Sequence, residues 1–250
     1  QSSTFQILED AAAYLCYCPT TSMEYALKRR DLTYFRRGIA REHARFIALA
    51  CVNNLGLSTG FGDASSLVCP EFFEALAPAA WFYRDPELYW VARNTLPQAC
   101  GLRVWQSSIA VDLGVEPREP KEWTGLIRFP LYEAPLAKGD LAKTPVFGEK
   151  RDVDPKRFNK LVFKENWSPE GQYLLLDGAG DWTGPGPHGH KHDDINTIPN
   201  FTALGRMWLV DHTYQTRAFQ DHSGVFTLCN GQGGYLKGAI AELKHLAQTP

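Results

Sequence analysis

The sequence predicts a multidomain α+β protein with a helical part over residues 1–115 and a β-rich part over 116–250. Over residues 24–51, apolar side chains recur every three or four positions with charges between them, which is typical of an amphipathic helix. After Trp105, short β-forming runs alternate with Pro, Gly and Asp, and long amphipathic stretches nearly vanish. The polar stretch 114–123, which contains prolines, is the best candidate for a linker.

Three helices are expected in the first part. The first carries the apolar stripe Phe35, Ile39, His43, Phe46, Ile47 and Ala50, and Asn53-Asn54-Leu55-Gly56 ends it. Two shorter helices are expected over 70–81 and 86–94, because each has a proline near its start. Together they predict a helix-rich layer.

Seven strands are expected in the second part, over 125–131, 160–164, 172–176, 197–202, 206–210, 224–229 and 239–246. Pro199 argues against an uninterrupted central strand in the fourth. Trp208 lies inside the apolar fifth strand and is expected in the core. The last segment favours a helix by composition but has no clean stripe for either structure, so both readings stay open.

Composition narrows the class of protein. The chain has 250 residues, 44% of them hydrophobic, as in a folded globular protein. Its formal net charge of −2 predicts neither nucleic acid nor a membrane surface as partner. No apolar run is long enough to cross a bilayer, and the first twenty residues lack the order of a signal peptide. Because the chain begins at Gln1 without Met, we expect a fragment or processed product.

The cysteines do not form a recognisable framework. The six are spread along the chain without a CxxC pair, so most are expected to be buried small hydrophobes. Cys16 and Cys18 leave open the alternatives of metal binding or disulfide pairing.

The segment Gly186-Pro-His-Gly-His-Lys-His-Asp-Asp194 concentrates metal-ligand chemistry. In an extended chain, the alternating residues His188, His190, His192 and Asp194 project from one face. Asp211 follows the apolar run 206–210, and His222 comes next. Zinc takes imidazole and carboxylate ligands, so His192, Asp211 and His222 would supply three of four positions, with water or substrate in the fourth.

Several alternatives stay open for this segment. A hairpin turning at Leu204-Gly205 would place Asp211 opposite Ile198, so the chain before Thr197 must fold back for the ligands to converge. The segment could instead be a glycine-rich surface loop, or His190 and His192 could bind one metal together. A metallo-β-lactamase signature fails because Ile195 stands where its last histidine belongs.

The order of motifs resembles the heparinase II/III-like polysaccharide lyases. The matching residues are Tyr173-Leu-Leu-Leu-Asp-Gly178, His190-x-His192-x-Asp194, Gly205-Arg-Met-Trp-Leu-Val-Asp211, Tyr214, Arg217 and His222, with Gly60-Phe-Gly-Asp-Ala64 and Phe82-Tyr-Arg-Asp-Pro86 upstream. Most of the chain is covered, and the 186–222 block is the most specific. The resemblance implies the end of an incomplete (α/α) toroid followed by an antiparallel β-sandwich, with a periplasmic or secreted location.

The resemblance also implies roles. It makes His190 the histidine of the catalytic face, and His192, Asp211 and His222 the ligands of a structural zinc. In β-elimination, a base removes the C5 proton of a uronic acid while an acid protonates the departing 4-oxygen. The family's acid is a toroid tyrosine with an asparagine or histidine partner, and the candidates are Tyr14, Tyr17, Tyr25 and Tyr34. Ser223 departs from the family's usual asparagine.

Substrate contacts are expected from Trp182, which could stack on a sugar ring, and from His188 and Arg217. Each has a plain alternative: Trp182 as packing, His188 as a spectator in a glycine-rich loop, Arg217 as a neighbour of the site. Arg37, Arg41 and Arg45 would form a basic stripe on one helix, for which a solvated surface is the stronger reading.

The expected function is therefore a polysaccharide lyase that acts on a uronate-containing glycan, with structural Zn²⁺ as the metal. An acidic polysaccharide or oligosaccharide is the expected partner, and a homodimer is compatible with the sequence. The alternative is a non-catalytic carbohydrate-binding or structural zinc protein derived from a lyase. A metal-dependent hydrolase comes third.

Overall fold

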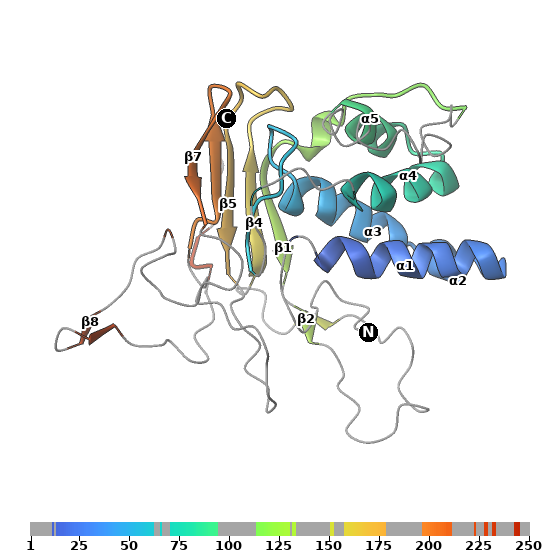
Figure 1. The fold of residues 1–250 in the computed structure, drawn as a ribbon, viewed down its shortest axis with the longest axis horizontal. Helices are drawn as coiled ribbons and strands as arrows, with labels where there is room; N and C mark the ends of the chain where they lie inside the picture. The colour runs from blue at the N-terminus through green and yellow to red at the C-terminus, as the bar shows by residue number, and fades with distance from the viewer. Residues whose placement is uncertain are drawn as a thin grey trace, which may run out of the picture.

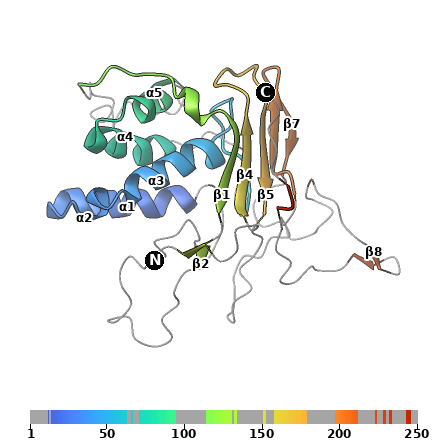
Figure 2. The same ribbon diagram turned by 180° about the vertical axis from the view of Figure 1, so that it is seen from behind.

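Helices lie on one side of a five-stranded antiparallel sheet in the computed structural model of the chain (Figures 1 and 2). The predicted α+β class is therefore confirmed. No helix in the described part of the chain is long and apolar enough to cross a bilayer. The structure describes residues 12, 14–62, 66, 71–94, 114–130, 132–133, 151–152, 158–178, 197–211, 223, 228–229, 232–233 and 243–245.

The first helical region is broken into pieces, so the prediction of one helix over 24–51 is wrong. It forms α1 (Tyr14–Arg29), α2 (Thr33–Arg36), α3 (Ile39–Phe46) and the π-helical turn η1 (Ile47–Cys51). Arg30 and Gly38 take left-handed φ values of 57° and 79°, a conformation that ends a helix. The predicted apolar stripe is still buried, because each piece turns that side inward.

The next two helices are close to expectation. These are α4 (Glu71–Tyr83) and α5 (Pro86–Asn94). Arg84 has a left-handed φ of 52° and ends α4. The Asp85 carboxylate then accepts hydrogen bonds from the main-chain N–H groups of Glu87 and Leu88, at 3.0 and 3.1 Å, and so caps α5.

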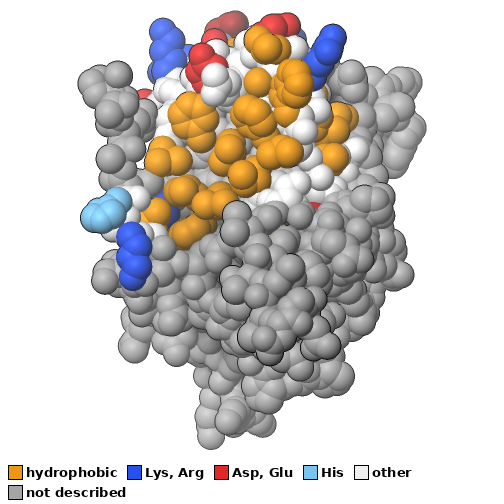
Figure 3. All heavy atoms as spheres, turned by 90° about the vertical axis from the view of Figure 1, so that its left-hand side faces the viewer, with side chains coloured by type: hydrophobic (Ala, Val, Ile, Leu, Met, Phe, Trp, Pro, Cys, Tyr) orange, Lys and Arg blue, Asp and Glu red, His pale blue; other side chains and the backbone are white. Residues whose placement is uncertain are grey.

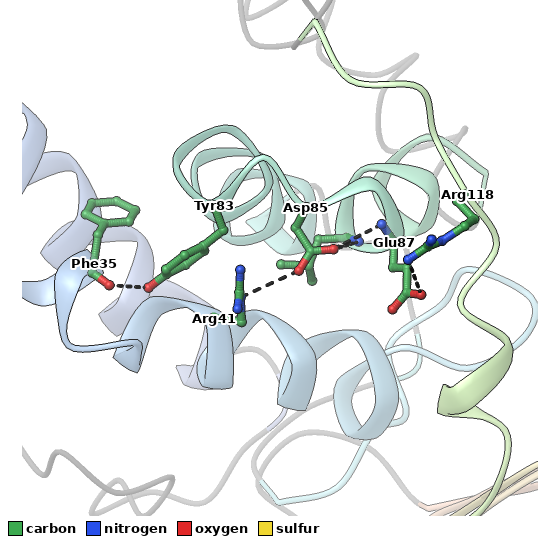
Figure 4. Close-up of polar contacts among 7 residues, drawn as sticks. Phe35, Arg41, Tyr83, Asp85, Glu87 and Arg118 are labelled. Carbon is green, nitrogen blue, oxygen red and sulfur yellow. Dashed lines mark hydrogen bonds and ion pairs between the residues drawn. The ribbon is translucent and has the colours of Figure 1, made fainter.

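The three arginines Arg37, Arg41 and Arg45 are exposed, as the reading of a solvated surface predicts. Gly38 separates Arg37 from α3, and the two arginines that lie on α3 pack against aromatic rings. Arg41 lies 4.3 Å from the centre of the Tyr83 ring and 3.6 Å from Asp85 (Figure 4). Arg45 lies 5.5 Å from the Trp123 ring. Both contacts tie α3 to its neighbours.

The stretch 114–123 connects α5 to the sheet and is mostly exposed, with Pro120 and Trp123 buried. The Arg118 N–H donates to Pro86 O at 3.0 Å, and its guanidinium lies 3.1 Å from Glu87 (Figure 4). The stretch ends in the 3₁₀ turn η3 (Lys121–Trp123), and the Trp123 ring is buried in the main core. Trp167 Nε1 donates to Pro120 O at 3.1 Å, which joins this stretch to the sheet.

The sheet has the strand order β1-β4-β5-β6-β7, and all its pairs are antiparallel. Its strands are β1 (Gly125–Pro130), β4 (Phe158–Lys164), β5 (Tyr173–Asp177), β6 (Asn200–Ala203) and β7 (Arg206–Val210). Two small pairs accompany it: β2 (Tyr132–Glu133) with β3 (Arg151–Asp152), and β8 (Leu228–Cys229) with β9 (Gln232–Gly233).

Three expected strands differ from the structure or fall largely outside it. Of the strand expected over 224–229, only Leu228–Cys229 is described, and it forms β8. The strand expected over 197–202 begins only at Asn200, because Pro199 has no N–H to donate to a ladder. Of the segment 239–246, only residues 243–245 are described, and they belong to neither helix nor strand.

One hydrophobic cluster joins the helices to the inner face of the sheet. Phe46, Leu49 and Leu76 share it with Val162, Tyr173 and Leu175, all of which are buried. The Tyr173 hydroxyl donates to Leu49 O at 2.8 Å. Helical part and sheet therefore bury apolar surface against each other.

The turn after η1 fastens to the sheet through two buried asparagines. Asn54 Nδ2 lies 3.1 Å from each of three carbonyl oxygens, those of Asn166, Ser168 and Gly171. Asn54 Oδ1 accepts a hydrogen bond from Lys164 Nζ. Asn53 Nδ2 donates to Asn200 Oδ1 at 3.2 Å. These bonds hold the chain between η1 and α4 against β4 and β6.

Lys164 is buried inside this interface between two aromatic rings. Its Nζ lies 4.2 Å from the centre of the Trp167 ring and 4.8 Å from that of Tyr173. Burial lowers the pKa of the Lys164 ammonium to about 7. Because the unfolded chain keeps an ordinary lysine pKa, it binds more protons than the folded chain between about pH 7 and 10.

We expect the free energy of unfolding to rise with pH in that window, by up to about 1.4 kcal/mol per pH unit. The measurement is urea unfolding at pH 7, 8 and 9 of the wild type and Lys164→Met. The variant should lose the slope, and equal slopes in the two proteins would contradict the assignment. The range stays below pH 10, since burial raises the pKa of Tyr173 well above its usual value and deprotonation of unfolded tyrosine then lowers stability.

The outer face of the sheet is apolar. The side chains of Leu161, Phe163, Leu174, Leu176 and Phe201 are half-buried there, and Figure 3 shows hydrophobic side chains gathered over this side of the molecule. Trp208, Leu209 and Val210 on β7 are exposed by 54%, 38% and 45%. The expectation that Trp208 lies in the core is therefore wrong, because β7 is the edge strand of the described sheet and the Trp208 side chain is exposed there.

Candidate functional site

One end of the sheet holds both ends of the histidine-rich segment. At the end of β5, the Asp177 N–H donates to Thr197 O at 3.1 Å. The next residue, Gly178, donates its N–H to Asn159 O at 2.9 Å. The chain leaves the sheet after Gly178 and is back beside the same point at Thr197. The two described residues on either side of segment 179–196, Gly178 and Thr197, therefore lie at the same end of the sheet.

Asp211 lies at this same end. Its N–H donates to Pro199 O at 2.8 Å, two residues after Thr197, and the residue is only 4% exposed. The predicted partner was Ile198. The difference of one residue arises because the ladder shifts between Phe201 and Thr202, where a bulge gives β7 one extra residue.

Ser223, the residue after the predicted ligand His222, lies at the same end of the sheet as Asp211. Its carbonyl oxygen accepts a hydrogen bond from the Ile198 N–H at 2.8 Å. Ser223 directly follows His222, so the main chain beside that histidine lies next to the stretch 197–199. Asp211 and the described residues that flank the other two predicted ligand regions, Thr197 and Ser223, thus lie at one end of the sheet.

One described donor at this point, the Asp211 carboxylate, is of a type that zinc accepts. A buried carboxylate is stable only with a cation or with hydrogen bonds, and Asp211 is such a carboxylate. Zinc accepts carboxylate oxygen together with imidazole nitrogen. His192 and His222 lie outside the described residues, so their part in a metal site with Asp211 stays a prediction.

The remaining predicted site residues are Trp182, His188, His190, His192, Arg217 and His222. All six lie outside the described residues, and their roles stay predictions. Within the described ranges, no three His, Cys, Asp or Glu side chains group to hold a metal ion. That result does not bear on a site whose histidines fall outside those ranges.

Sequence reasoning missed a buried ion pair at this end of the sheet. Lys160 Nζ lies 3.1 Å from Asp177 Oδ1, and the two side chains are 0% and 2% exposed. The two residues are directly opposite each other on β4 and β5. The available signal was Lys160-Leu-Val-Phe-Lys164, in which both lysines fall on the same face as Val162.

Tyr34 is one of the tyrosines predicted as candidates for the general acid of β-elimination, and its side-chain contacts are described. Its hydroxyl shares a hydrogen bond with His43 Nδ1, and burial lowers the pKa of that imidazole to about 4, so His43 is neutral at pH 7. Tyr34 packs in a second cluster with Met23, Phe35 and Ile39, apart from the core that lines the sheet. This surrounding indicates a packing role.

For the other tyrosines predicted as candidates for the general acid, that role stays a prediction. Tyr25 is 65% exposed on α1. Tyr14 and Tyr17 lie in the first turns of α1, where side-chain positions are outside the described part of the structure.

Comparison of the chain with models of protein families, and separately with curated proteins, finds no match.

Proposed function

We propose that this chain is part of a polysaccharide lyase that cleaves a uronate-containing glycan by β-elimination. One observation carries the proposal: the two residues that flank segment 179–196, the buried Asp211 and the residue after His222 meet at one end of the sheet. The motifs that resemble heparinase II/III-like lyases need this convergence, because their ligands are dispersed over residues 192–222.

The chemistry follows from the residue types. When bound, zinc would supply a fixed point that holds the histidine-rich segment against the sheet. His192, Asp211 and His222 would orient around it, which leaves His190, two residues away, to face the sugar. A histidine with a pKa near neutrality can remove the C5 proton or help to neutralise the uronate. Trp182, His188 and Arg217 would contact the glycan.

The proposal includes the finer architecture, in which the helices are the end of an (α/α) toroid and the sheet is half of a β-sandwich. The apolar outer face of the sheet supports the second point. A face that carries Leu161, Phe163 and Leu174 is stable in water only when another layer covers it. The helices already cover the opposite face, so the expected layer is a second sheet.

Elimination leaves an unsaturated uronate that absorbs in the ultraviolet. The test is to incubate the chain with alginate, heparan, chondroitin and ulvan and to follow that absorbance. A rise with at least one glycan is expected. Binding of a glycan without any rise would overturn the proposal and favour the non-catalytic carbohydrate-binding alternative.

A further inference from the structure

We propose that the buried ion pair between Lys160 and Asp177 is a positioning element for the end of the sheet where Asp211 lies. It would fix the point where the chain leaves the sheet after Gly178 and returns at Thr197. The inference rests on the proposed function, because it concerns how the zinc site is held. Its structural part can be measured without metal or activity.

Asp177 takes part in two contacts at once. Its carboxylate lies 3.1 Å from Lys160 Nζ, while its own N–H donates to Thr197 O at 3.1 Å. The side chain therefore fixes the residue across β4, and the main chain fixes the returning segment. Asp211 is bonded two residues further along, at Pro199, so a shift of Asp177 would pass to Asp211 through a short, hydrogen-bonded path.

Lys160 extends the same connection to the helical part. Its Nζ lies 4.3 Å from the centre of the Phe61 ring, and Phe61 belongs to the turn that follows η1 and the asparagines. Phe61 is fully buried, and its carbonyl oxygen accepts a hydrogen bond from Ala12 N at 3.1 Å. The ammonium thus lies between an aromatic ring on one side and the Asp177 carboxylate on the other.

The neighbouring packing leaves the exit of the chain little freedom. A Cβ on Gly178 would lie 2.3–2.6 Å from atoms of Phe158, so only glycine fits there without movement. The Gly178 N–H donates to Asn159 O at 2.9 Å. Gly178, the last described residue before segment 179–196, is therefore closely held next to the ion pair.

Energetics separate a positioning role from simple stabilisation. Two apolar side chains of similar size often replace a buried ion pair without loss of stability, whereas removal of one partner leaves a buried charge. An apolar pair has no preferred direction of contact. The ion pair does, because charge and hydrogen-bond geometry fix the carboxylate against the ammonium.

The test compares the wild type with Lys160→Met/Asp177→Val, which removes both members of the ion pair together. Lys164→Met is the matched control, because it removes a second buried lysine from the same face of β4 at the opposite end. Hydrogen exchange is followed in peptides that cover Gly178 and 197–199. Zinc affinity is measured by competition with a chromophoric chelator, and thermal unfolding reports global stability.

The double variant should unfold close to the wild-type temperature. It should nevertheless exchange at least about tenfold faster at the two peptides and bind zinc at least about tenfold more weakly. Lys164→Met should leave both quantities within about twofold, whatever its effect on unfolding. Wild-type exchange and zinc affinity in the double variant would overturn the inference.

Two further outcomes are decisive. If the wild type binds no zinc, the proposed metal site fails, but the exchange measurement still decides the positioning role. If the double variant does not fold, Asp177→Asn replaces it, because the amide has nearly the same shape as the carboxylate. Faster exchange at the two peptides with unchanged exchange in α4 would support the inference, and a uniform increase over the chain would overturn it.

Discussion

Replacement of His190 by alanine is expected to lower the rate of β-elimination by about 10²–10⁴-fold and to leave the zinc content unchanged. The first effect follows because a positioned acid or base contributes about that factor to the rate. The second follows because His192, Asp211 and His222 hold the metal in the proposed site. Initial rates from ultraviolet absorbance and metal content by atomic absorption measure the two effects.

Two matched histidine variants complete the experiment. His192→Ala should lose both zinc and activity, since it removes a ligand. His245→Ala changes an exposed histidine and should resemble the wild type in both measurements. Loss of zinc from His190→Ala would show that the two histidines have exchanged or shared roles. An undiminished rate in that variant would remove His190 from the chemistry.

Replacement of Asn54 by leucine is expected to lower the free energy of unfolding by about 3–5 kcal/mol. The side chain is 4% exposed, and its NH₂ group serves three carbonyl oxygens at 3.1 Å. An amide has only two hydrogens, so the three acceptors share them. Leucine would leave these carbonyls unsatisfied and would also remove the acceptor of the buried Lys164 ammonium. Urea unfolding at pH 7 measures the loss.

Asn94 offers a matched control for this variant. It is exposed at the end of α5, and its Nδ2 donates to a single carbonyl, Trp90 O, at 2.8 Å. Asn94→Leu should change the free energy of unfolding by no more than about 0.5 kcal/mol. A loss below about 1 kcal/mol for Asn54→Leu would mean that water or neighbouring groups replace its hydrogen bonds.

Local signals predicted some elements closely. The helix over 86–94 has the predicted bounds, because Asp85 and Pro86 are adjacent start signals that act within one turn. The helix over 24–51 was mispredicted because it ends first at Arg30, a residue whose left-handed conformation is not evident from its type. The apolar period alone does not reveal such a break, since the pieces on both sides still face one core.

The partners of the buried lysines could not be predicted from short stretches of sequence. The alternation in Lys160-Leu-Val-Phe-Lys164 places both lysines on the same face as Val162, but a charged residue is rarely fully buried without a partner, and the sequence does not show which partner it has. Their partners lie 17 and 110 positions away in the sequence. Likewise, the one-residue shift opposite Asp211 comes from a bulge that no turn signal announces. The candidate site could be predicted as a set of residue types, but not as a geometry.

The lysines on the inner face also protect the sheet against misalignment. Side chains alternate between faces, so a slip of β4 by one position would turn Lys160 and Lys164 toward the apolar outer side. The slip would take one ammonium away from Asp177 and the other away from Asn54. A sheet built only from Leu, Val and Phe could tolerate that error, since both of its sides would remain apolar. Because only the native register pairs both ammonium groups with their partners, the two lysines make that register of β4 the most stable one.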